Sequence, residues 1–597
     1  MKKVDFMCTA FRDGLQSVYG ARVLSKDVLP IIKMAHEAGI EHLEVGGGAL
    51  FQSPFFYTKE NAFEIMDNIR STVGSSANLQ TLARGVSVVA LTSQSSDIID
   101  LHAKLFKKHG MTTIRNFDAL NDVENLIFSG QSIHNAGLKH EVCITMMSLP
   151  VGTSGAHDAD FYEKTLKEII KSQIPFDSLC FKDASGTSTP AVIYETIKRA
   201  RKILGDSVKI AFHSHDTAGT CIAQYLAAVE AGANQVDLSL APVSGGTCQS
   251  DLLSMWHALR YSDYTLDIDP EKILALESAF TEAMQDYFLP PEAKEVNPII
   301  PFSPLPGGAL TANTQMLRDN DLMDKFPQIT RAMADTVKRG GFGTSVTPVS
   351  QFYFQQAFNN VMHGDWQKIV DGYGKMILGY FGKTPVAPDP EIVKLASEQL
   401  NLPVNTKKVL EINDANPQLR LPHYRDILTK ENLPTTDENI FIIASCGEKG
   451  VLFLKGASTI NVRKEAKSAI TSAPTLSSDQ PITIQLDGES FVVEINGDQA
   501  TVNGTTYRMN LNQESAPSQP QSTKSNTINA PLPGLILKLL KPAGATVKAG
   551  EVVLIMEAMK MESPIKSHVD GTIDQIYVQN TQQVKSGDRL FSIKERG

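Results

Sequence analysis

A lysine near the C-terminus stands in an unusual chemical setting. Lys560 lies between Met559 and Met561 in the segment LIMEAMKMES, which contains a strongly apolar run. In the simplest interpretation, the methionines belong to a hydrophobic core and the lysine is an ordinary solvated cation. In the alternative, the lysine is presented to another enzyme for covalent modification, because flexible and polarisable methionines suit a recognition surface. The surrounding sequence decides between these two interpretations.

Two histidines form a candidate metal site. His213 and His215 stand two residues apart in HSHD, directly after the apolar run VKIAF. Side chains two apart on a strand point to the same side, so both imidazoles can reach one ion at the strand end. Nitrogen ligands of this kind fit a transition metal, and we expect Zn, Mn or Co. By itself, the pair is equally compatible with two polar residues that close a strand.

Charged residues at the ends of two other apolar runs offer further ligands. The segment FRDGLQS contains Arg12, Asp13 and Gln16, which supply a cation, a hard oxygen ligand and a hydrogen-bond donor. Lys182, in FKD, ends a second run, where an ion pair with a carboxylate is the simplest interpretation. Alone, FRDGLQS is also compatible with a salt-bridged loop. The carboxyl ends of barrel strands gather catalytic groups, so we expect Asp13 to converge with the two histidines there.

These groups require strands that end on one side of a sheet. The first part of the chain alternates short β-rich runs with amphipathic helical segments, which indicates a parallel sheet. The β-rich runs are VDFMCTA, EHLEVGG, LQTLARG, TTIRNFD, HEVCITMM, FDSLCFKD, VKIAFHSH and QVDLSLA. About eight such units within ~250 residues are typical of a TIM barrel. We therefore expect an α/β protein with a TIM (β/α)8 barrel rather than a doubly wound open sheet.

The rest of the chain divides by composition into further parts. A Pro/Gly-rich stretch, in which we expect Gly307 and Gly308 to form a turn, interrupts a helical region. Short β-like runs then return, namely IFIIASC, PITIQLDG, SFVVEING and ATVNGTTYRM, and a Ser/Pro/Gln-rich segment without aromatic residues follows. The expected parts are a barrel domain at 1–265, a helical extension at 266–435, a small β-rich domain at 436–512, a flexible linker at 513–528 and a carrier-like β-sandwich at 529–597.

The last segment contains an internal repeat. VKAGE at 547–551 matches VKSGD at 584–588, and Gly534 matches Gly571. Two copies of a β-rich unit predict a small pseudo-symmetric β-sandwich. Lys560 then falls on the hairpin that joins the two halves, where an exposed side chain is expected. The repeat therefore favours the modification of Lys560 over its burial in a core.

Bulk composition limits the classes of function. The formal net charge of −10 gives no reason to expect nucleic acid or an anionic membrane surface as a partner. The six cysteines are scattered without a CxxC pair, which argues against disulfides and thiolate zinc sites and favours a reducing compartment. The sequence shows neither an apolar signal segment nor a run near the ~20 residues of a membrane span. We expect a cytoplasmic protein without direct membrane insertion.

The C-terminal motif resembles a known carrier module. The segment PLPG at 531–534 and the later EAMKME are similar to the biotin carboxyl carrier domain, in which the lysine between the methionines bears biotin. The related lipoyl domain usually has its lysine in a D-K-A context. The resemblance implies a biotinyl/lipoyl-like β-sandwich with biotin on Lys560. It also implies a biotin protein ligase as a partner, which reads Met559 and Met561.

The remaining motifs resemble a family of carboxyltransferases. FRDGLQS, FKD and HSHD, together with GYFGKTPVAPDPE, are similar to the carboxyltransferase domain shared by pyruvate carboxylase, transcarboxylase and the oxaloacetate decarboxylase α subunit. The first motif departs from the usual RDAHQS at Gly14 and Leu15, and Cys8 stands where many members have an aspartate. Its arginine, aspartate and glutamine are kept, so the resemblance still implies their metal and substrate roles.

The resemblance also assigns roles to individual residues. It implies a divalent metal held by Asp13, Lys182 (as a catalytic N-carboxylysine), His213 and His215. It implies a keto acid bound by Arg12, Gln16 and Arg84. Thr347 would shuttle a proton between the substrate methyl carbon and biotin, and Asp118 would support the metal shell. From the residues alone, Thr347 before Pro348 is typical of a helix N-cap followed by proline.

Biotin-dependent carboxyl transfer is the activity that these motifs imply. CO2 would move from carboxybiotin to pyruvate to give oxaloacetate. No GxxxxGK[ST] or other ATP-binding segment is recognisable, so a separate biotin carboxylase subunit is expected as a partner, and we also expect a homo-oligomer. The alternatives are the α subunit of a sodium-pumping oxaloacetate decarboxylase and the large subunit of a 2-oxoglutarate carboxylase. A third alternative, from a different class of reaction, is a metal-dependent condensing enzyme with RDG and HxH motifs in its barrel.

Overall fold

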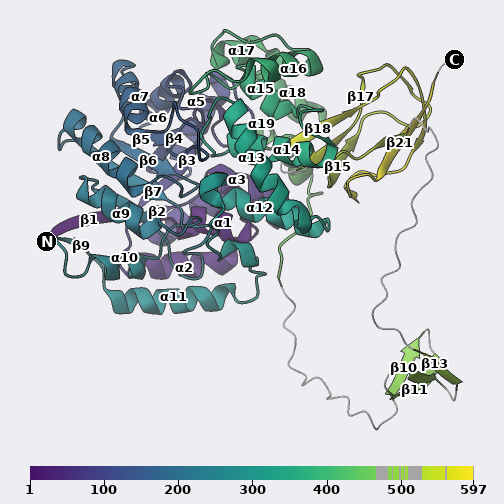
Figure 1. Cartoon of the computed structure of the whole chain (residues 1–597), viewed down its shortest axis with the longest axis horizontal. Helices are drawn as coiled ribbons and strands as arrows, with labels where there is room; N and C mark the ends of the chain where they lie inside the picture. Colours follow the sequence, from purple (N-terminus) through teal and green to yellow (C-terminus); the bar gives the residue numbers. More distant parts are fainter. Residues whose placement is uncertain are drawn as a thin grey trace. The chain divides into compact units, whose positions relative to one another are not determined.

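The structure, a computed structural model, describes residues 1–464, four strands between 482 and 508, and the ranges 527–558 and 561–595 (Figure 1). Residues 1–464 and 528–597 form one compact unit, and residues 465–527 form another. The first unit contains a barrel, a helical extension and a C-terminal β-domain. None of the described helices combines the length and the apolar character needed to cross a bilayer.

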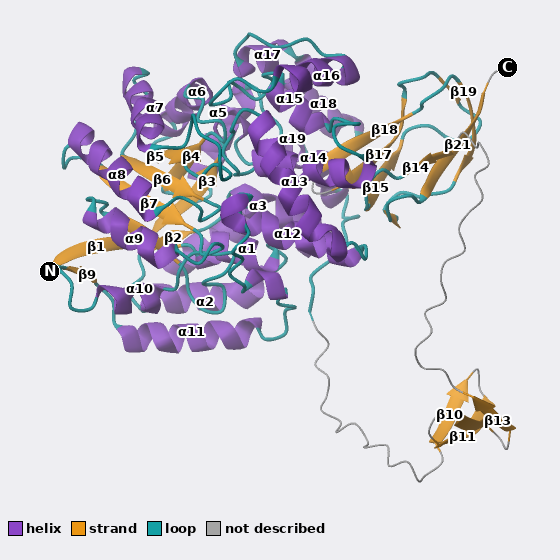
Figure 2. Ribbon diagram, viewed as in Figure 1, coloured by secondary structure: helices purple, strands orange, loops and turns teal. Residues whose placement is uncertain are grey.

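Eight parallel strands close into a barrel at the centre of the first unit (Figure 2). The hydrogen-bonded order is β2-β3-β4-β5-β6-β7-β8-β1, and β1 also pairs with β2 through Cys8 and Leu43, which closes the sheet. The strands are β1 (Lys2–Cys8), β2 (His42–Glu44), β3 (Asn78–Ala83), β4 (Thr113–Phe117), β5 (Lys139–Thr145), β6 (Ser178–Asp183), β7 (Lys209–Ser214) and β8 (Gln235–Leu238). A short strand, β9 (Tyr264–Leu266), pairs with the start of β1. The predicted TIM barrel is confirmed, and the open sheet is excluded.

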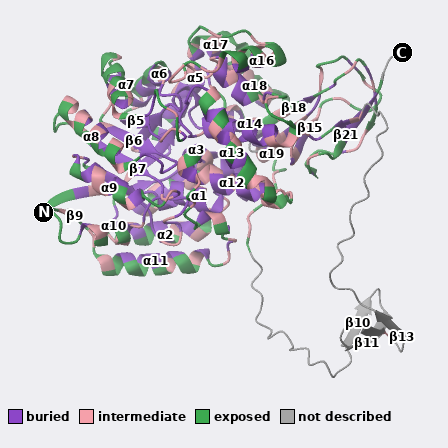
Figure 3. Cartoon of the chain, in the orientation of Figure 1, coloured by how far each residue is buried: buried purple, intermediate pink, exposed green. Residues whose placement is uncertain are grey.

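Amphipathic helices surround the barrel, as Figure 2 shows. They are α2 (Ser25–Glu37), α4 (Ala62–Val73), α5 (Ser96–Lys108), α6 (Glu124–Asn135), α7 (Ala159–Lys171), α8 (Pro190–Leu204), α9 (Cys221–Glu230), α10 (Leu252–Leu259) and α11 (Pro270–Met284). Local sequence fixes several starts: Asp158 accepts a hydrogen bond from the Phe161 backbone N–H, and Thr189 caps α8 just before Pro190. The apolar faces of these helices and of the strands form one continuous core (Figure 3).

A helical extension covers the carboxyl end of the barrel. Its helices are α12 (Gly307–Asp319), α13 (Phe326–Arg339), α14 (Val349–His363), α15 (Asp371–Ile377), α16 (Pro390–Leu400), α17 (Val409–Ala415) and α18 (Leu421–Lys430). A second hydrophobic core joins Leu82 and Phe117, near the ends of β3 and β4, to Leu310, Phe352 and Tyr373 of the extension. The ends of β3 and β4 are therefore shielded from solvent by α12 to α16, whereas α17 and α18 pack through Val409 and Leu428 against the core of the barrel domain.

The segment IFIIASC is helical, contrary to the strand that we predicted at the start of a β-rich domain at 436–512. It lies in α19 (Asp437–Leu454), which begins after Thr436, whose side chain accepts a hydrogen bond from the Asn439 N–H. Phe441 is buried against Phe51 and Phe106 of the barrel domain. A short, continuously apolar run does not distinguish a buried strand from a buried helix, and here tertiary packing selects the helix. The helical part therefore continues past residue 435.

The second unit contains an antiparallel sheet. Its strands, in hydrogen-bonded order, are β10 (Ile482–Leu486), β11 (Glu489–Asn496), β12 (Gln499–Val502) and β13 (Thr505–Arg508). Three of the predicted β-like runs, PITIQLDG, SFVVEING and ATVNGTTYRM, supply these strands. The predicted linker at 513–528 lies outside the described residues except at its end, because β14 (Thr527–Asn529) already begins at Thr527.

The C-terminal domain consists of two four-stranded sheets, ordered β14-β21-β19-β16 and β18-β17-β15-β20. The further strands are β15 (Gly534–Leu539), β16 (Thr546–Val547), β17 (Val552–Ala558), β18 (Met561–Lys566), β19 (Gly571–Ile576), β20 (Gln583–Val584) and β21 (Arg589–Glu595). The two repeats exchange strands: β15 of the first pairs with β20 of the second, and β19 of the second pairs with β16 of the first. The predicted pseudo-symmetric sandwich is confirmed.

The two matched glycines of the repeat, Gly534 and Gly571, are required for the same structural reason. A Cβ atom on Gly534 would lie 2.2 Å from the carbonyl oxygen of Glu557, and one on Gly571 would lie 2.4 Å from that of Lys594. Both glycines have ordinary negative or extended φ angles. Close approach of the paired strand, rather than an unusual backbone conformation, therefore requires glycine at both positions.

The hairpin predicted between the two halves joins β17 to β18. β17 ends at Ala558 and β18 begins at Met561, and these two residues pair directly across the hairpin. Met559, Lys560 and the side chain of Met561 lie outside the described residues. The described strands therefore end on either side of the two residues Met559 and Lys560.

Candidate active site

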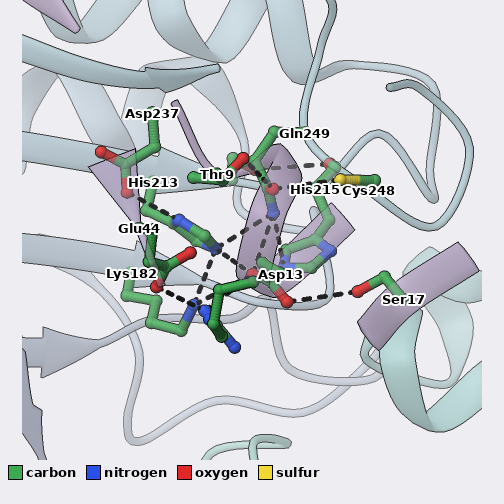
Figure 4. Close-up of polar contacts among 12 residues, drawn as sticks. Thr9, Asp13, Ser17, Glu44, Lys182, His213, His215, Asp237, Cys248 and Gln249 are labelled. Carbon is green, nitrogen blue, oxygen red and sulfur yellow. Dashed lines mark hydrogen bonds and ion pairs between the residues drawn. The ribbon is translucent and has the colours of Figure 1, made fainter. Parts of the chain in front are cut away.

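Asp13, His213 and His215 come together at the carboxyl end of the barrel, as the sequence predicted. The π-helical turn η1 (Ala10–Gly14) after β1 carries Asp13, and the end of β7 carries the two histidines (Figure 4). Asp13 Oδ2 lies 3.3 Å from His213 Nε2 and 3.2 Å from His215 Nε2. All three side chains are buried, and their possible ligand atoms lie within 4.8 Å of one another. One carboxylate oxygen and two imidazole nitrogens are a donor set that suits a transition metal.

Lys182 lies beside the same cluster. It stands opposite His213 in the parallel pairing of β6 and β7, and its Nζ is 2.7 Å from His213 Nε2 and 3.7 Å from Asp13 Oδ2. An ammonium group at this point would repel a bound cation. The lysine fits a metal site only after its positive charge is removed, as carbamylation would do.

Carbonyl and carboxylate groups orient both imidazoles. His213 Nδ1 lies 2.8 Å from Asp237 Oδ2, and His215 Nδ1 lies 2.7 Å from the carbonyl oxygen of Thr247. These oxygen atoms accept hydrogen bonds, so each ring carries its proton on Nδ1 and presents an Nε2 lone pair to the cluster. Burial and the nearby Lys182 lower the pKa of His213, which favours its neutral form.

Asp237 belongs to a buried charged network below the cluster. Its carboxylate lies 2.5 Å from the guanidinium of Arg115, which also contacts Glu141 at 2.5 Å. Burial alone would raise the pKa of Asp237, but Arg115 and His213 hold it below its ordinary value. The sequence analysis missed Asp237, although an acidic residue inside the apolar run QVDLSL was the available signal. Asp118, which was expected to support the metal shell, instead accepts hydrogen bonds from the N–H groups of its own loop.

Gln249 is a further member of the cluster that the sequence analysis missed. Its Nε2 lies 3.1 Å from Asp13 Oδ2, 3.3 Å from His213 Nε2 and 3.0 Å from His215 Nε2. Thr9 Oγ1 donates to its Oε1 at 2.6 Å. Gln249 stands in the loop after β8, within the polar run SGGTCQS, where only its amide group distinguished it from turn residues.

Arg12 is held by carboxylates next to the cluster. Its guanidinium lies 2.6 Å from Glu44 Oε1 and 3.2 Å from Asp13 Oδ2, and it donates to Gln16 Oε1 at 3.4 Å. The buried Nε–H of Arg12 has no hydrogen-bond partner within the described part of the chain. Arg12 therefore joins the metal-site aspartate to Gln16 and retains one free donor.

Arg84 is a buried cation without a carboxylate partner among the described residues. Its side chain donates to the carbonyl oxygens of Val89 and Ala90 at 2.7 and 2.9 Å, and its Nε–H is unpartnered. Burial lowers the pKa of Arg84 to about 9, and the charge of Arg12 adds to this effect. A buried guanidinium is costly unless an anion pairs with it, so Arg84 suits an acidic ligand.

Two glycines leave space around Gln16. A Cβ atom on Gly48 would lie 3.4 Å from Gln16 Oε1 and 3.6 Å from the guanidinium of Arg84. A Cβ atom on Gly308 would lie 3.3 Å from Gln16 Nε2. Gln16 therefore lies within reach of Arg84 on one side and of α12 on the other. The predicted keto-acid residues Arg12, Gln16 and Arg84 form one contiguous group.

Gly307 and Gly14 allow backbone segments to approach the cluster. A Cβ atom on Gly307 would lie 1.7 Å from the carbonyl oxygen of Thr247 and 2.9 Å from His215 Nδ1. The turn predicted for Gly307 and Gly308 is wrong, because both residues lie in the first turn of α12. A Cβ atom on Gly14 would lie 2.6 Å from Val243, which explains why glycine replaces the alanine of the related motif.

Thr347 does not cap a helix, contrary to the interpretation from its residue type. The N-cap of α14 is Pro348, and the peptide bond between Thr347 and Pro348 is cis. The half-buried Thr347 hydroxyl makes no hydrogen bond to any described residue, and no described contact joins it to Asp13 or the histidines. Its proposed role in proton transfer therefore stays a prediction.

Comparisons with known proteins also divide the chain into a barrel part, a middle part and a C-terminal carrier part. Family models match residues 3–279 as "HMGL-like", 300–503 as "Conserved carboxylase domain" and 526–593 as "Biotin-requiring enzyme". A pyruvate carboxylase subunit of Methanocaldococcus jannaschii is 28% identical over 568 residues, which cover 94% of each chain. The 2-oxoglutarate carboxylase large subunit of Hydrogenobacter thermophilus is 24% identical over 98% of this chain and 94% of that protein.

A solved structure shows the same fold. The carboxyl transferase domain of Rhizobium etli pyruvate carboxylase, with pyruvate and biocytin, superimposes with a TM-score of 0.69 at 24% identity. The match covers 85% of this chain and 88% of that one.

The barrel site, the carboxylase domain and the carrier domain on one chain define a biotin-dependent carboxyltransferase. Within this class, the chain is similar to the pyruvate carboxylase subunit of Methanocaldococcus jannaschii over nearly the whole length of both proteins.

Proposed function

We propose that the chain is the carboxyltransferase and biotin-carrier subunit of a two-subunit pyruvate carboxylase. A carboxyl group carried by biotin on Lys560 is transferred to pyruvate, and oxaloacetate is formed. The observation that carries this proposal is Arg84, a buried guanidinium that no carboxylate of the described residues neutralises. Gly48 lies between Arg84 and Gln16, since a Cβ atom there would approach both side chains, and Arg12 joins Gln16 to Asp13 of the candidate metal cluster.

The residues of the cluster fit a divalent ion, for which we propose Zn, Mn or Co. Asp13, His213 and His215 would hold it, and Lys182 would join them as an N-carboxylysine, which exchanges a cation for a carboxylate. A bound ion would supply Lewis-acid stabilisation of developing negative charge on the substrate oxygen. Asp237 and Thr247 keep the imidazole Nε2 atoms turned toward the cluster.

The substrate is held through its carboxylate. Arg84 provides the planar guanidinium that suits such a group, and Gln16 offers an amide beside it. Arg12 is already engaged by Glu44 and Asp13, so it contributes positive charge and one free Nε–H rather than a second full clamp. The helices above the strand ends keep water away from the reacting carbon.

Proton transfer is the task of Thr347 in this proposal. Its hydroxyl would accept the proton of the substrate methyl carbon and pass its own proton to the departing biotin nitrogen. The N–C bond of carboxybiotin would break, which releases CO2 and leaves the nitrogen that takes up this proton. The enolate carbon would then attack the released CO2, and a new C–C bond would form. An uncommitted hydroxyl supports this role, since a helix-capping threonine would already be engaged.

The proposal includes partners. A biotin carboxylase subunit would load the carrier, and a biotin protein ligase would modify Lys560. We also propose a homo-oligomer and a cytoplasmic location, and the six free, buried cysteines fit a reducing compartment.

Reconstitution tests the proposal. The biotinylated chain is mixed with a biotin carboxylase subunit, ATP, bicarbonate and either pyruvate or 2-oxoglutarate, and the carboxylated product is measured. We expect oxaloacetate from pyruvate, loss of activity in Lys560→Arg, and a KM for pyruvate raised at least tenfold in Arg84→Gln. Arg70→Gln, which removes another backbone-bonded arginine on α4, is the control.

Three results would contradict the proposal. Carboxylation of 2-oxoglutarate alone would assign the site to the longer keto acid. Decarboxylation of oxaloacetate that requires sodium and a membrane partner would favour the decarboxylase. No carboxylation of either acid by a fully biotinylated chain would exclude both carboxylase assignments.

A further inference from the structure

The hairpin that bears Lys560 rests on the kinked part of α19. The helix is interrupted at Gly447, which has φ 54° and ψ −140°, and the residues that follow contact β17 and β18. Lys449 Nζ lies 2.9 Å from Glu557 Oε2, and the backbone N–H of Glu448 donates to Glu562 Oε1 at 3.1 Å. The two carboxylates stand three residues before and two residues after the lysine.

Gly447 is necessary for this contact. A Cβ atom at this position would lie 2.5 Å from Glu562 Oε1 and 3.1 Å from its Cδ. The positive φ of Gly447 also turns the following N–H toward the hairpin, a conformation that side chains disfavour. One glycine therefore supplies both the space and the backbone direction that Glu562 needs.

Lys449 is prepared to receive a carboxylate. Lys449 is 9% exposed beside the hairpin, and its Nζ lies 4.6 Å from the ring centre of Phe56 and 5.5 Å from that of Tyr57. Both rings belong to the turn η2 (Pro54–Thr58) of the barrel domain, so the barrel domain holds the ammonium group beside Glu557. A fixed, partly desolvated cation selects an anion in a defined position.

The hairpin itself carries a charge that needs a partner. Glu557 and Glu562 stand directly opposite each other in the register of β17 and β18. Like charges at opposed positions destabilise an antiparallel pair. Lys449 and the Glu448 N–H offset this repulsion, and Lys538 of β15 adds an ion pair to Glu448 at 2.9 Å.

The contact is built for release. A groove of about 750 Å3, lined among others by Arg22, Asn313 and Lys585, opens beside Glu557 and Lys449. Lys585 of the carrier domain also pairs with Asp321 of the helical extension. The two charged groups are 3.5 Å apart, and both side chains are exposed. Exposed ion pairs contribute little stability, so the largely buried Lys449–Glu557 pair and the half-buried Leu532, which packs against the core of the extension, are the main contacts that hold the domain in place.

We propose that the kinked half of α19, from Gly447 to Lys449, is a dock for the β17–β18 hairpin, and that docking and the modification of Lys560 exclude each other. The ligase forms an amide between the biotin carboxylate and Lys560 Nζ while ATP is cleaved to AMP and pyrophosphate. Glu557 and Glu562, which contact α19, stand within three residues of the lysine in the sequence. An enzyme that encloses the lysine must therefore cover the surface that α19 covers. The second half of the proposal rests on the function proposed for Lys560.

Loss of the dock is measured on the full, unmodified chain. Lys449→Gln keeps the size of the side chain and removes its charge, and Gly447→Ala fills the space of the Glu562 carboxylate. We expect faster amide hydrogen exchange at residues 447–449 and a several-fold faster incorporation of biotin by purified ligase with ATP. Lys455→Gln is the control, because it removes an ion pair with Glu431 and leaves Lys449 in place. We expect it to change neither the hydrogen exchange nor the rate of biotin incorporation. Unchanged exchange in a correctly folded Lys449→Gln chain would show that there is no dock.

A reversible lock tests the exclusion directly. Cysteines at 448 and 562 (Glu448→Cys with Glu562→Cys) are oxidised to hold the hairpin on α19, and biotin incorporation is measured before and after reduction. We expect at least tenfold slower incorporation in the oxidised chain, with recovery on reduction to the rate of the unoxidised double variant. Equal rates in the two redox states would overturn the exclusion. If even the wild-type chain takes up no biotin, the function proposed for Lys560 fails, whereas the exchange measurement still reports on the dock.

Discussion

Arg115, Asp237 and His213 show how one buried charge positions another. Asp237 accepts from His213 Nδ1 and also neutralises Arg115, so the same carboxylate fixes a candidate metal ligand and satisfies a buried cation. Removing either partner of a buried pair leaves an uncompensated charge in a region of low dielectric. The orientation of the metal ligand and the stability of the barrel are therefore coupled through Asp237.

Asp237→Asn should affect both properties. We expect metal affinity to fall about 10- to 100-fold, because His213 loses the partner that sets its tautomer. We also expect the free energy of unfolding to fall by about 3 kcal/mol, because Arg115 loses a carboxylate. Metal titration of the metal-free protein and chemical denaturation measure the two effects.

Asp5→Asn is the matched control for that substitution. Asp5 also lies on a barrel strand and pairs with a cation, Lys209. The side chains of Asp5 and Lys209 are, however, 44% and 43% exposed. We expect a change within about 0.5 kcal/mol and unaltered metal affinity. Equal metal affinity in wild type and Asp237→Asn would show that His213 does not depend on this carboxylate.

Residue types in the sequence were sufficient to predict that Asp13, His213 and His215 cluster as candidate metal ligands, but not to predict the residues that support them. Asp13, His213 and His215 stand at strand ends, where a local pattern has a direct spatial meaning. Asp237 and Gln249 reach the cluster from β8 and its following loop, and their roles depend on distances that only the closed barrel sets. Asp118 was placed near the metal by resemblance, whereas its carboxylate organises its own loop.

At the scale of elements, the internal repeat was more informative than local hydrophobicity. The repeat correctly predicted a two-part β-sandwich because matched turns and glycines report strand pairing. IFIIASC was predicted as a strand because it is apolar and β-branched, but α19 is surrounded by other elements and needs no polar face. Burial on all sides removes the periodicity that would have identified the helix.

The packing of α19 can be tested with Phe441→Ala. The Phe441 ring is fully buried, with its centre 5.4 Å from that of Phe51 and 6.3 Å from that of Phe106. We expect a loss of about 3–5 kcal/mol in the free energy of unfolding, since a large cavity opens in a packed core. Leu274→Ala on α11, a residue that is 53% exposed, should cost less than about 0.5 kcal/mol. Similar costs for the two variants, measured by denaturant titration, would argue against the core position of α19.

The paired glycines of the C-terminal domain make a second prediction for elements. Gly534→Ala and Gly571→Ala should each destabilise that domain by about 1–3 kcal/mol, because a methyl group meets the carbonyl oxygen of the paired strand. Gly550 and Gly587 occupy the other matched positions of the repeat and have positive φ angles. A Cβ atom added at either position would meet no atom within 4 Å, so Gly550→Ala and Gly587→Ala are the controls. They should show only the backbone cost of about 1 kcal/mol. Thermal unfolding of the domain compares the four variants, and a larger effect at 550 and 587 than at 534 and 571 would refute the steric explanation.

At the scale of the whole molecule, the carrier domain is covalently joined to the site that it serves but has a core of its own. Its buried cluster, which includes Ile536, Leu554 and Phe591, draws only on residues between 528 and 593. The barrel and its extension are likewise built around two cores whose buried members, among the described residues, all lie outside the carrier, although the half-buried Leu532 packs against the second core. We therefore expect fragments 1–464 and 527–597 to fold separately.

Separation of the fragments should retain the site but lower the rate of transfer. A tethered carrier reaches its site at an effective concentration in the millimolar range, whereas a free carrier reaches it at its bulk concentration. With a biotin carboxylase, ATP and pyruvate, fragment 1–464 and the biotinylated fragment 527–597 at 10 μM should form oxaloacetate about 100-fold more slowly than the intact chain, and the rate should rise linearly with carrier concentration. Metal affinity of fragment 1–464 should equal that of the whole protein, because every ligand lies within it. A rate independent of carrier concentration would show that the tether does not supply the effective concentration. Circular dichroism shows whether both fragments are folded. If folded fragments gave no transfer at any carrier concentration, residues 465–526 would be needed for transfer itself and not only to connect the two parts.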